Sequence, residues 1–239
     1  MPPTARGHSR TFALARRALA RRALAFLLGV ITACVVTSCA LLQPRADPTK
    51  FYVLTSPNVL SPSVTADGPA GYRIGLRAIE MPAYLRTKRM VVRSGANEIH
   101  FAEFDRWAEP LDGGISRVLK EALRVDDNVE LVAMDFQGDD PLDYSVTIRV
   151  QACEGVRGGS GTGSIIFGMT WEIQPVGISK PGIRRGGFTA APAVWDGKDY
   201  GQLARQLSLA ITAAGQALAA DLRVTALISR KSNVEASRP

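Results

Sequence analysis

A cysteine stands at the end of an apolar run near the start of the chain, where its thiol is suited to acylation. Six arginines and no acidic residue come before it, and the apolar run ends in Val36-Thr37-Ser38-Cys39. A basic segment, an apolar core and small residues before a boundary are the layout of a bacterial secretory signal. A cysteine at that boundary has the pattern of a lipobox, in which the thiol takes a diacylglycerol and the chain is cut just before it. We therefore predict that Cys39 is the acylated first residue of the mature protein.

Other interpretations of this segment stay open. The 20 uncharged residues from Ala23 to Leu42 are long enough to span a bilayer as a helix, so an uncleaved anchor is one alternative. A soluble secreted form is another. A second lipobox-like quartet ends at Cys34, but cleavage there would shorten the apolar core. The preferred organisation is a signal peptide over 1–38, a lipidated tether over 39–50, a folded domain over 51–228 and a flexible tail over 229–239.

Residues suited to catalysis are few in the rest of the chain. His100 is the only histidine after Cys39, so a Ser-His-Asp or Cys-His site would have to use it. Metal sites of the His/Cys type need several ligands that the chain lacks. Cys153 has no partner for an intramolecular disulfide once Cys39 is acylated, and we expect it to be a small buried residue. We predict no enzyme, no metal and no cofactor other than the diacylglycerol and N-acyl chain (palmitate) on Cys39.

Two further patterns have plainer explanations than catalysis. Glu103, Asp105 and Glu109 lie within seven residues of one another, whereas a glycosidase usually places its two acids on separate elements facing a cleft. Local ion pairing with Arg106 is the simpler interpretation. The glycine-rich segment 158–164 lacks the Gly-Lys-Ser/Thr of a phosphate loop and precedes a strand, so it predicts a hairpin loop.

The net charge of +7 belongs to the targeting segment. The chain has 29 basic and 22 acidic residues, and six of the basic ones precede Cys39, which leaves 23 against 22 in the mature part. No stripe of basic residues interleaved with aromatic ones follows. We therefore expect no nucleic-acid partner.

Hydrophobic periodicity predicts the elements that position these residues. Period-two alternation indicates strands over 72–79, 142–152 and 165–173, and further strands are expected over 51–54, 129–134 and 184–190. The segments 89–93 and 98–101 form a predicted hairpin. Helical spacing predicts a short helix over 111–124 and a long amphipathic helix over 199–228. This order indicates an α+β domain with a mostly antiparallel or mixed sheet and two main helices packed on one face.

Three stretches of the domain resemble a known family. They are Phe51-Tyr52-Val53-Leu54, the segment from Ile79 to Leu85, and the ten-residue block Ala102-Glu103-Phe104-Asp105-Arg106-Trp107-Ala108-Glu109-Pro110-Leu111 that leads into the short helix. They are similar to the ABC-type transport auxiliary lipoproteins, the PqiC-like proteins. The block is specific to this family, whereas the rest of the similarity is a matter of pattern.

The resemblance implies a lipoprotein on the periplasmic side of the outer membrane that supports envelope integrity. Its partner would be an MCE-domain protein of an intermembrane lipid transporter, and a homo-oligomer matching an MCE ring is compatible with the family. The residue after Cys39 is Ala40 rather than Asp, which favours the outer membrane under the enterobacterial sorting rule. The candidate docking or family-signature residues are Glu103, Phe104, Asp105, Arg106, Trp107, Glu109 and Pro110.

Alternatives to this function and to these roles also remain. Trp107, with Phe104 and Arg106, is either an interface anchor or, with Phe104, a plug in the core where the hairpin meets the helix. A lipid carrier would instead enclose an acyl chain in a pocket of its own, lined by residues such as Phe167, Met169, Trp171 and Leu207. A structural envelope lipoprotein would act without a transport partner.

Overall fold

The computed structural model describes residues 26–27, 46–56, 72–123, 129–132, 142–159, 161–176 and 182–236. The chain divides into two compact units, Met1–Pro48 and Thr49–Pro239, and the second unit is the folded domain. Cys34 and Cys39 lie outside the described residues, as does the segment 58–71, whose Ser, Pro and Gly residues predict a loop. The account below concerns the second unit.

A long antiparallel hairpin forms the middle of the sheet. It consists of β6 (Tyr144–Arg157) and β7 (Gly163–Pro175), which pair along almost their whole length. On its other edge, β7 pairs with two short strands, β8 (Arg184–Thr189) and β9 (Val194–Trp195). The alternating apolar residues of 142–152 and 165–173 bring about this pairing, because each strand turns one apolar side to the core.

Two groups of strands share the other edge of β6. Its first half pairs with β2 (Tyr72–Leu76), and β2 pairs with β5 (Val129–Val132). Its second half pairs with β3 (Arg89–Arg93), followed by β4 (Ile99–Trp107) and β1 (Lys50–Tyr52). Four of the eight ladders between the described strands are parallel: β1–β4, β2–β5, β2–β6 and β3–β6. The sheet is therefore mixed, as predicted, with fewer antiparallel pairs than the local hairpins alone indicated.

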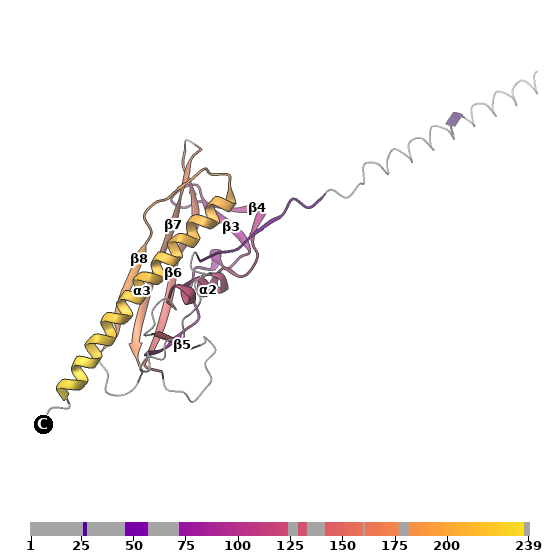
Figure 1. Cartoon of the computed structure of the whole chain (residues 1–239). Helices are drawn as coiled ribbons and strands as arrows, with labels where there is room; N and C mark the ends of the chain where they lie inside the picture. The colour runs from indigo at the N-terminus through magenta and orange to yellow at the C-terminus, as the bar shows by residue number, and fades with distance from the viewer. Residues whose placement is uncertain are drawn as a thin grey trace, which may run out of the picture. The chain divides into compact units, whose positions relative to one another are not determined.

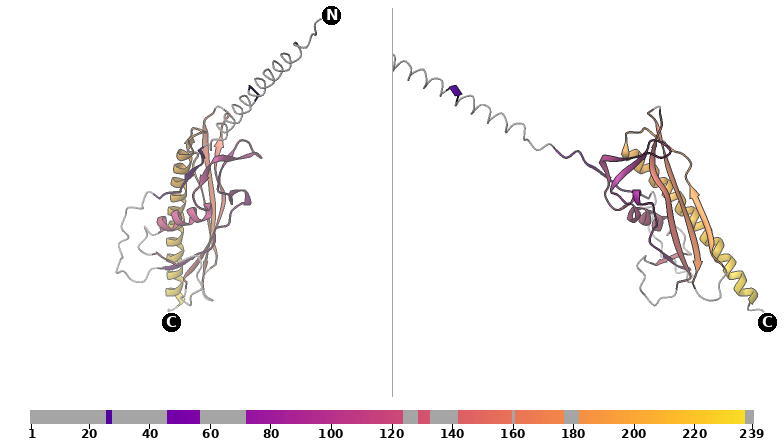
Figure 2. Two further views of the ribbon diagram at one scale, coloured as in Figure 1. Left: turned by 90° about the vertical axis from the view of Figure 1, so that its right-hand side faces the viewer. Right: turned by 180° about the vertical axis from the view of Figure 1, so that it is seen from behind.

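Both main helices lie on one face of the sheet, as predicted (Figure 2). The shorter, α2, spans Leu111–Leu123, and the longer, α3, spans Tyr200–Ala236 and runs along β7 and β8 (Figure 1). They approach closely at Gly215, where an added Cβ would lie only 2.6 Å from the Cβ of Ala122. A 3-10 turn, η1 (Ala83–Leu85), precedes β3. The backbone of α3 continues to Ala236, into the segment where a tail was expected from residue 229.

The apolar side of α3 explains its membrane-like composition. Among the described residues, Tyr200–Ile228 is long and apolar enough to cross a bilayer, but half of its most apolar stretch is buried in the domain. Leu203, Leu207, Ile211 and Leu218 pack against the sheet as part of the hydrophobic core. We therefore identify α3 as a core helix.

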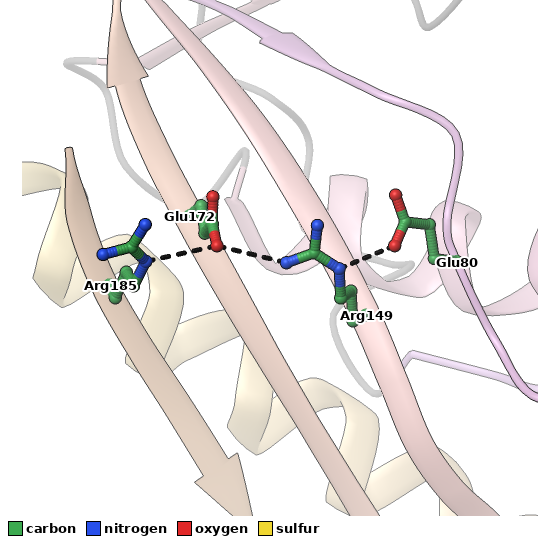
Figure 3. A network of polar contacts seen from close by, with 4 residues as sticks. All are labelled: Glu80, Arg149, Glu172 and Arg185. Carbon is green, nitrogen blue, oxygen red and sulfur yellow. Dashed lines mark hydrogen bonds and ion pairs between the residues drawn. The ribbon is translucent and has the colours of Figure 1, made fainter.

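The sheet face turned away from α3 carries a row of alternating charges (Figure 3). Arg149 on β6 contacts Glu80 at 2.6 Å and Glu172 on β7 at 3.1 Å, and Arg185 on β8 contacts Glu172 at 3.2 Å. We call these four residues the charge ladder. Their side chains are largely solvated, so at this place the sheet face carries exposed ion pairs and is not covered by another layer.

Candidate functional site

The ten-residue block of 102–111, hereafter the signature block, forms the second half of β4 and the connection to α2. Its strand part receives β1 as a parallel neighbour, with Lys50 opposite Asp105, Phe51 opposite Arg106 and Tyr52 opposite Trp107. The backbone N–H of Ala108 also donates to the carbonyl of Tyr52 at 2.8 Å. The block therefore holds the first strand of the domain, which is the strand that follows the predicted tether.

A half-buried phenol reinforces this pairing. The hydroxyl of Tyr52 donates to Oδ1 of Asp105 at 2.8 Å, which joins two residues 53 positions apart in the sequence. Loss of hydration on burial, followed by the hydrogen bond to Asp105, raises the pKa of Tyr52 to about 12. The neutral phenol is thus the form that the folded protein favours.

Arg117 of α2 binds both the main chain just after β1 and the signature block. Its Nη2 donates to the carbonyl of Leu54 at 2.9 Å and forms a short ion pair with Oε1 of Glu109 in the signature block. Gly114 permits this arrangement, because a Cβ there would lie 3.3 Å from Leu54 and 3.2 Å from Glu109. The helical pattern placed Arg117 on the polar face of its helix, and nothing local in the sequence indicated these partners.

The long helix provides a third attachment. Ser208 on α3 accepts a hydrogen bond from the backbone N–H of Thr55 at 3.0 Å, and its own hydroxyl donates to the carbonyl of Ala204 at 2.7 Å. Ser208 is buried, so the N–H of Thr55 finds its partner out of water. Both helices and β4 therefore bind the chain between Lys50 and Thr55, and we call this arrangement the N-terminal clamp.

The two aromatic residues of the signature block have different places. Trp107 is 3% exposed and belongs to the hydrophobic core, whereas Phe104 is 41% exposed. They are three positions apart on β4, in the stretch where its register with β3 shifts, and only Trp107 reaches the core. Of the two residues expected to plug the core, the structure buries Trp107 alone.

Ion pairing within the signature block differs from the expectation. Asp105 accepts from Tyr52 and Glu109 pairs with Arg117, so neither acid pairs with Arg106. The Nε of Arg106 is buried and has no hydrogen-bond partner among the described residues, and Glu103 is exposed. Pro110 places its carbonyl at the start of α2, where it accepts from the N–H of Gly114 at 3.1 Å. Tyr52 on β1 and Arg117 on α2 therefore take the place of Arg106 as partners of Asp105 and Glu109.

The remaining candidates for chemistry lie apart from one another. His100 is exposed on β4 and contacts Glu98 at 3.0 Å. Cys153 is fully buried, and burial raises the pKa of its thiol to about 12, as expected for an inert core residue. The segment 158–164 links β6 to β7, and the N–H of Gly158 donates to the carbonyl of Thr162 at 2.9 Å. No group of three or more His, Cys, Asp or Glu residues in the described part of the chain is placed to hold a metal ion.

The side chains suggested for an acyl-chain pocket belong to the packed core. Phe167, Met169 and Trp171 point from β7 towards the helices, and Leu207 meets them from α3; all four are buried in one hydrophobic cluster. The indole of Trp171 also donates to Oδ2 of Asp221 at 3.0 Å, which ties β7 to α3. Their arrangement joins the sheet to the long helix.

Comparison with known proteins identifies the family. A family model described as the ABC-type transport auxiliary lipoprotein component matches residues 52–219. A crystal structure of a Xanthomonas campestris protein superposes with a TM-score of 0.61 at 15% identity, covering 77% of this chain and 99% of that one. A crystal structure of an uncharacterized protein gives 0.55 at 15% identity, covering 73% and 98%. No curated protein matches. The two structures share the fold, and the family match runs from β1 through the signature block into α3. The chain therefore belongs to the family of ABC-type transport auxiliary lipoprotein components.

Proposed function

We propose that this protein is the outer-membrane docking component of an ABC-type intermembrane lipid transporter. Cys39 carries the lipid anchor, the domain faces the periplasm, and the partner is the MCE-domain protein of the transporter. The protein acts by holding a partner in place beside a membrane, which requires a firmly suspended domain and no catalysis. Envelope integrity depends on it through the lipid supply that the transporter maintains.

The N-terminal clamp is the observation that carries this proposal. Lys50 follows Cys39 by 11 residues, so an extended tether reaches at most about 40 Å before the chain enters the sheet. From there β4, Arg117 and Ser208 hold the next residues by hydrogen bonds to the main chain. A domain fixed so close to its own attachment point is suited to positioning a partner. Several acyl chains on one cysteine give a stable anchor, whereas one chain gives only marginal binding.

The test is purification of the tagged full-length protein from its native membranes in mild detergent. Partners are identified by mass spectrometry, and the intact mass is measured in the same sample. We expect an MCE-domain protein to co-purify and the mature chain to begin at acylated Cys39. A clean monomer that carries a bound phospholipid would replace docking with a carrier function. Recovery of neither partner nor lipid would leave a structural envelope lipoprotein as the function.

Two cysteine variants make the anchor test specific. Cys39→Ser should keep the residues before position 39 and lose acylation, because the acceptor thiol is gone. Cys34→Ser is the matched control and should be processed and acylated like the unmodified protein, since it leaves the preferred boundary intact. The opposite pattern, with processing lost in Cys34→Ser only, would move the anchor to Cys34. Retention of the first 38 residues in every form would indicate a membrane span.

A further inference from the structure

Exposed apolar residues gather where the tether enters the domain. Burial alternates along the first strand and beyond it, so that Tyr52 and Leu54 turn inward while Phe51 and Val53 turn outward. The side chain of Phe51 is 62% exposed, and Phe104 on the neighbouring strand is also exposed. Scattered single apolar residues on a surface need no explanation, but a group of them at one place usually marks an interaction site.

Basic residues lie in the same row as Phe51. The strand register places Phe51 opposite Arg106 and Arg106 opposite Arg89, so these three residues form a row across β1, β4 and β3 on one face of the sheet. Phe104 is 41% exposed and precedes Arg106 by two positions, in the stretch of β4 where the register with β3 shifts. We call Phe51, Val53, Phe104, Arg89 and Arg106 the tether-side patch.

The charge of this patch is not neutralised within the described part of the domain. No ion pair among the described residues involves Arg89 or Arg106. Lys50 and Lys88 are exposed next to the row in sequence and add positive charge. Glu103 is exposed directly before Phe104, and no ion pair among the described residues joins it to Arg89 or Arg106. The patch therefore combines apolar side chains with unpaired guanidinium groups.

We propose that the tether-side patch rests on the headgroups of anionic phospholipids in the membrane that carries the anchor. Phe51, Val53 and Phe104 enter the interfacial region, and Arg89 and Arg106 meet lipid phosphates. Aromatic side chains favour the membrane interface, and basic side chains are attracted to anionic leaflets. The proposal rests on acylation of Cys39, because an 11-residue tether to Lys50 keeps the patch near the bilayer.

This contact would orient the whole domain. The C-terminal end of α3 lies at the end of the domain away from β3 and β4 (Figure 1). With the patch on the membrane, that end projects into the periplasm, where a transporter component can reach it. The lipid anchor alone would leave the domain free to rotate about its tether.

The test uses full-length acylated protein in vesicles and a polarity-sensitive fluorophore on a single introduced cysteine. Phe51→Cys and Phe104→Cys place the label in the patch. Leu227→Cys, near the far end of α3, is the matched control because Leu227 is 62% exposed, like Phe51. Cys153 is buried with its thiol pKa raised to about 12, so it should stay unlabelled. Vesicles contain phosphatidylethanolamine with either phosphatidylglycerol or phosphatidylcholine.

In phosphatidylglycerol vesicles, we expect blue-shifted emission and a severalfold fall in iodide quenching for the labels at positions 51 and 104. The label at 227 should behave as it does in water. Equal iodide access at all three positions, in protein that floats with the vesicles, would overturn the proposal while leaving the anchor intact. Protection that appears only after the transporter is added would also overturn it, in favour of a protein partner. Unacylated protein that fails to float would overturn both proposals, and the intact mass distinguishes this case.

Charge reversal tests the phosphate contact separately. Arg89→Glu should abolish the preference for phosphatidylglycerol over phosphatidylcholine in the quenching of the label at position 51. Arg185→Glu, which reverses a charge on the far strand β8, should keep that preference. Equal protection in both kinds of vesicle before any charge reversal would overturn the assignment to anionic lipid.

Discussion

The N-terminal clamp and the charge ladder use the same chemistry for different ends. Both pair arginine with carboxylates, yet the clamp fastens a short edge strand and the residues that follow it, whereas the ladder lies on strands that are already paired along their length. Arg117 binds both Glu109 and the main-chain carbonyl of Leu54. Arg149 binds Glu172, whose strand β7 already pairs with β6, and Glu80, which already forms a backbone bridge to Arg149. How much an ion pair stabilises the fold depends on whether other contacts already hold its two segments together.

The ion pairs themselves differ little in solvation, because the side chains of Arg117 and Glu109 are 39% and 34% exposed and those of Arg149 and Glu172 are 48% and 30% exposed. The side chains of the ladder are solvated. Hydrogen bonds from Arg185 and Arg149 lower the pKa of Glu172. Exposed ion pairs of this kind nevertheless add little to the stability of the fold. The clamp is half-buried and works beside Trp107, a large core residue. Four substitutions, ordered by expected effect, test the comparison.

The largest effect is expected from Trp107→Ala. Removal of this buried indole should lower the free energy of unfolding by about 3–5 kcal/mol, because it leaves a cavity under the clamp. Urea unfolding followed by circular dichroism measures the change. Phe104→Ala is the control, and its cost should stay near the roughly 0.5 kcal/mol of a surface substitution. Equal losses for the two variants would mean that both aromatic residues support the core.

Next is Arg117→Met, which keeps the aliphatic length but removes the guanidinium. The loss of the Glu109 pair and of the bond to the Leu54 carbonyl should cost about 1–2 kcal/mol. Hydrogen exchange should accelerate first at the N–H groups of Ala108 and Thr55, which bind across the clamp. Exchange that accelerates equally in β6 would show that the clamp does not open as a local unit.

Tyr52→Phe should cost about 1 kcal/mol near neutral pH through the lost hydrogen bond to Asp105. Because folding raises the pKa of Tyr52 from 10.0 to about 12, its contribution is complete below pH 10 and is lost as pH rises through 12. The stability gap between the two proteins should therefore shrink over that interval, as measured by urea midpoints at each pH. The raised pKa of Tyr84, whose causes do not involve Tyr52, acts alike in both proteins and cancels. A gap that stays constant from pH 9 to pH 12 would contradict the assignment of this pKa.

The smallest effect is expected in the charge ladder. Arg149→Ala removes two exposed ion pairs and should leave the urea midpoint of unfolding almost unchanged. Any difference from the unmodified protein should shrink further in high salt, because exposed charges are screened. A loss as large as that of Arg117→Met would erase the contrast between the two regions.

Hydrophobic periodicity predicted the helices and strands better than it predicted which strands pair with one another. The alternation of 142–152 and 165–173 predicted β6 and β7 correctly, since each strand has one side in the core. It did not reveal the irregularity between Val150 and Ala152, after which Cys153 and Glu154 are both buried. Parallel pairing was also hidden, because β1 meets β4 across some fifty residues and no turn sequence joins them.

The contacts of the N-terminal clamp could not be predicted from the sequence for a related reason. The signature block was recognisable, but Asp105 finds its partner in Tyr52 of β1 and Glu109 finds its partner in Arg117 of α2. The third attachment joins Ser208 to the backbone of Thr55, far apart in the sequence. Arg117 looks like an ordinary solvated helix residue, and Ser208 like a small residue in an alanine-rich helix. Trp107 is buried and Phe104 is exposed, and predicting that difference required knowing that β4 continues to Trp107 and that its register with β3 shifts on the way.

The clamp also determines how a mechanical load would travel through the domain. Any pull on the chain before Lys50 acts first on β1, an edge strand held by only three residue pairs. Arg117 passes that load to α2 and Ser208 passes it to α3, so both helices share the tension directly. The long hairpin of β6 and β7 lies outside this route. A domain tugged from its tether would yield at its first strand while its central hairpin stayed folded.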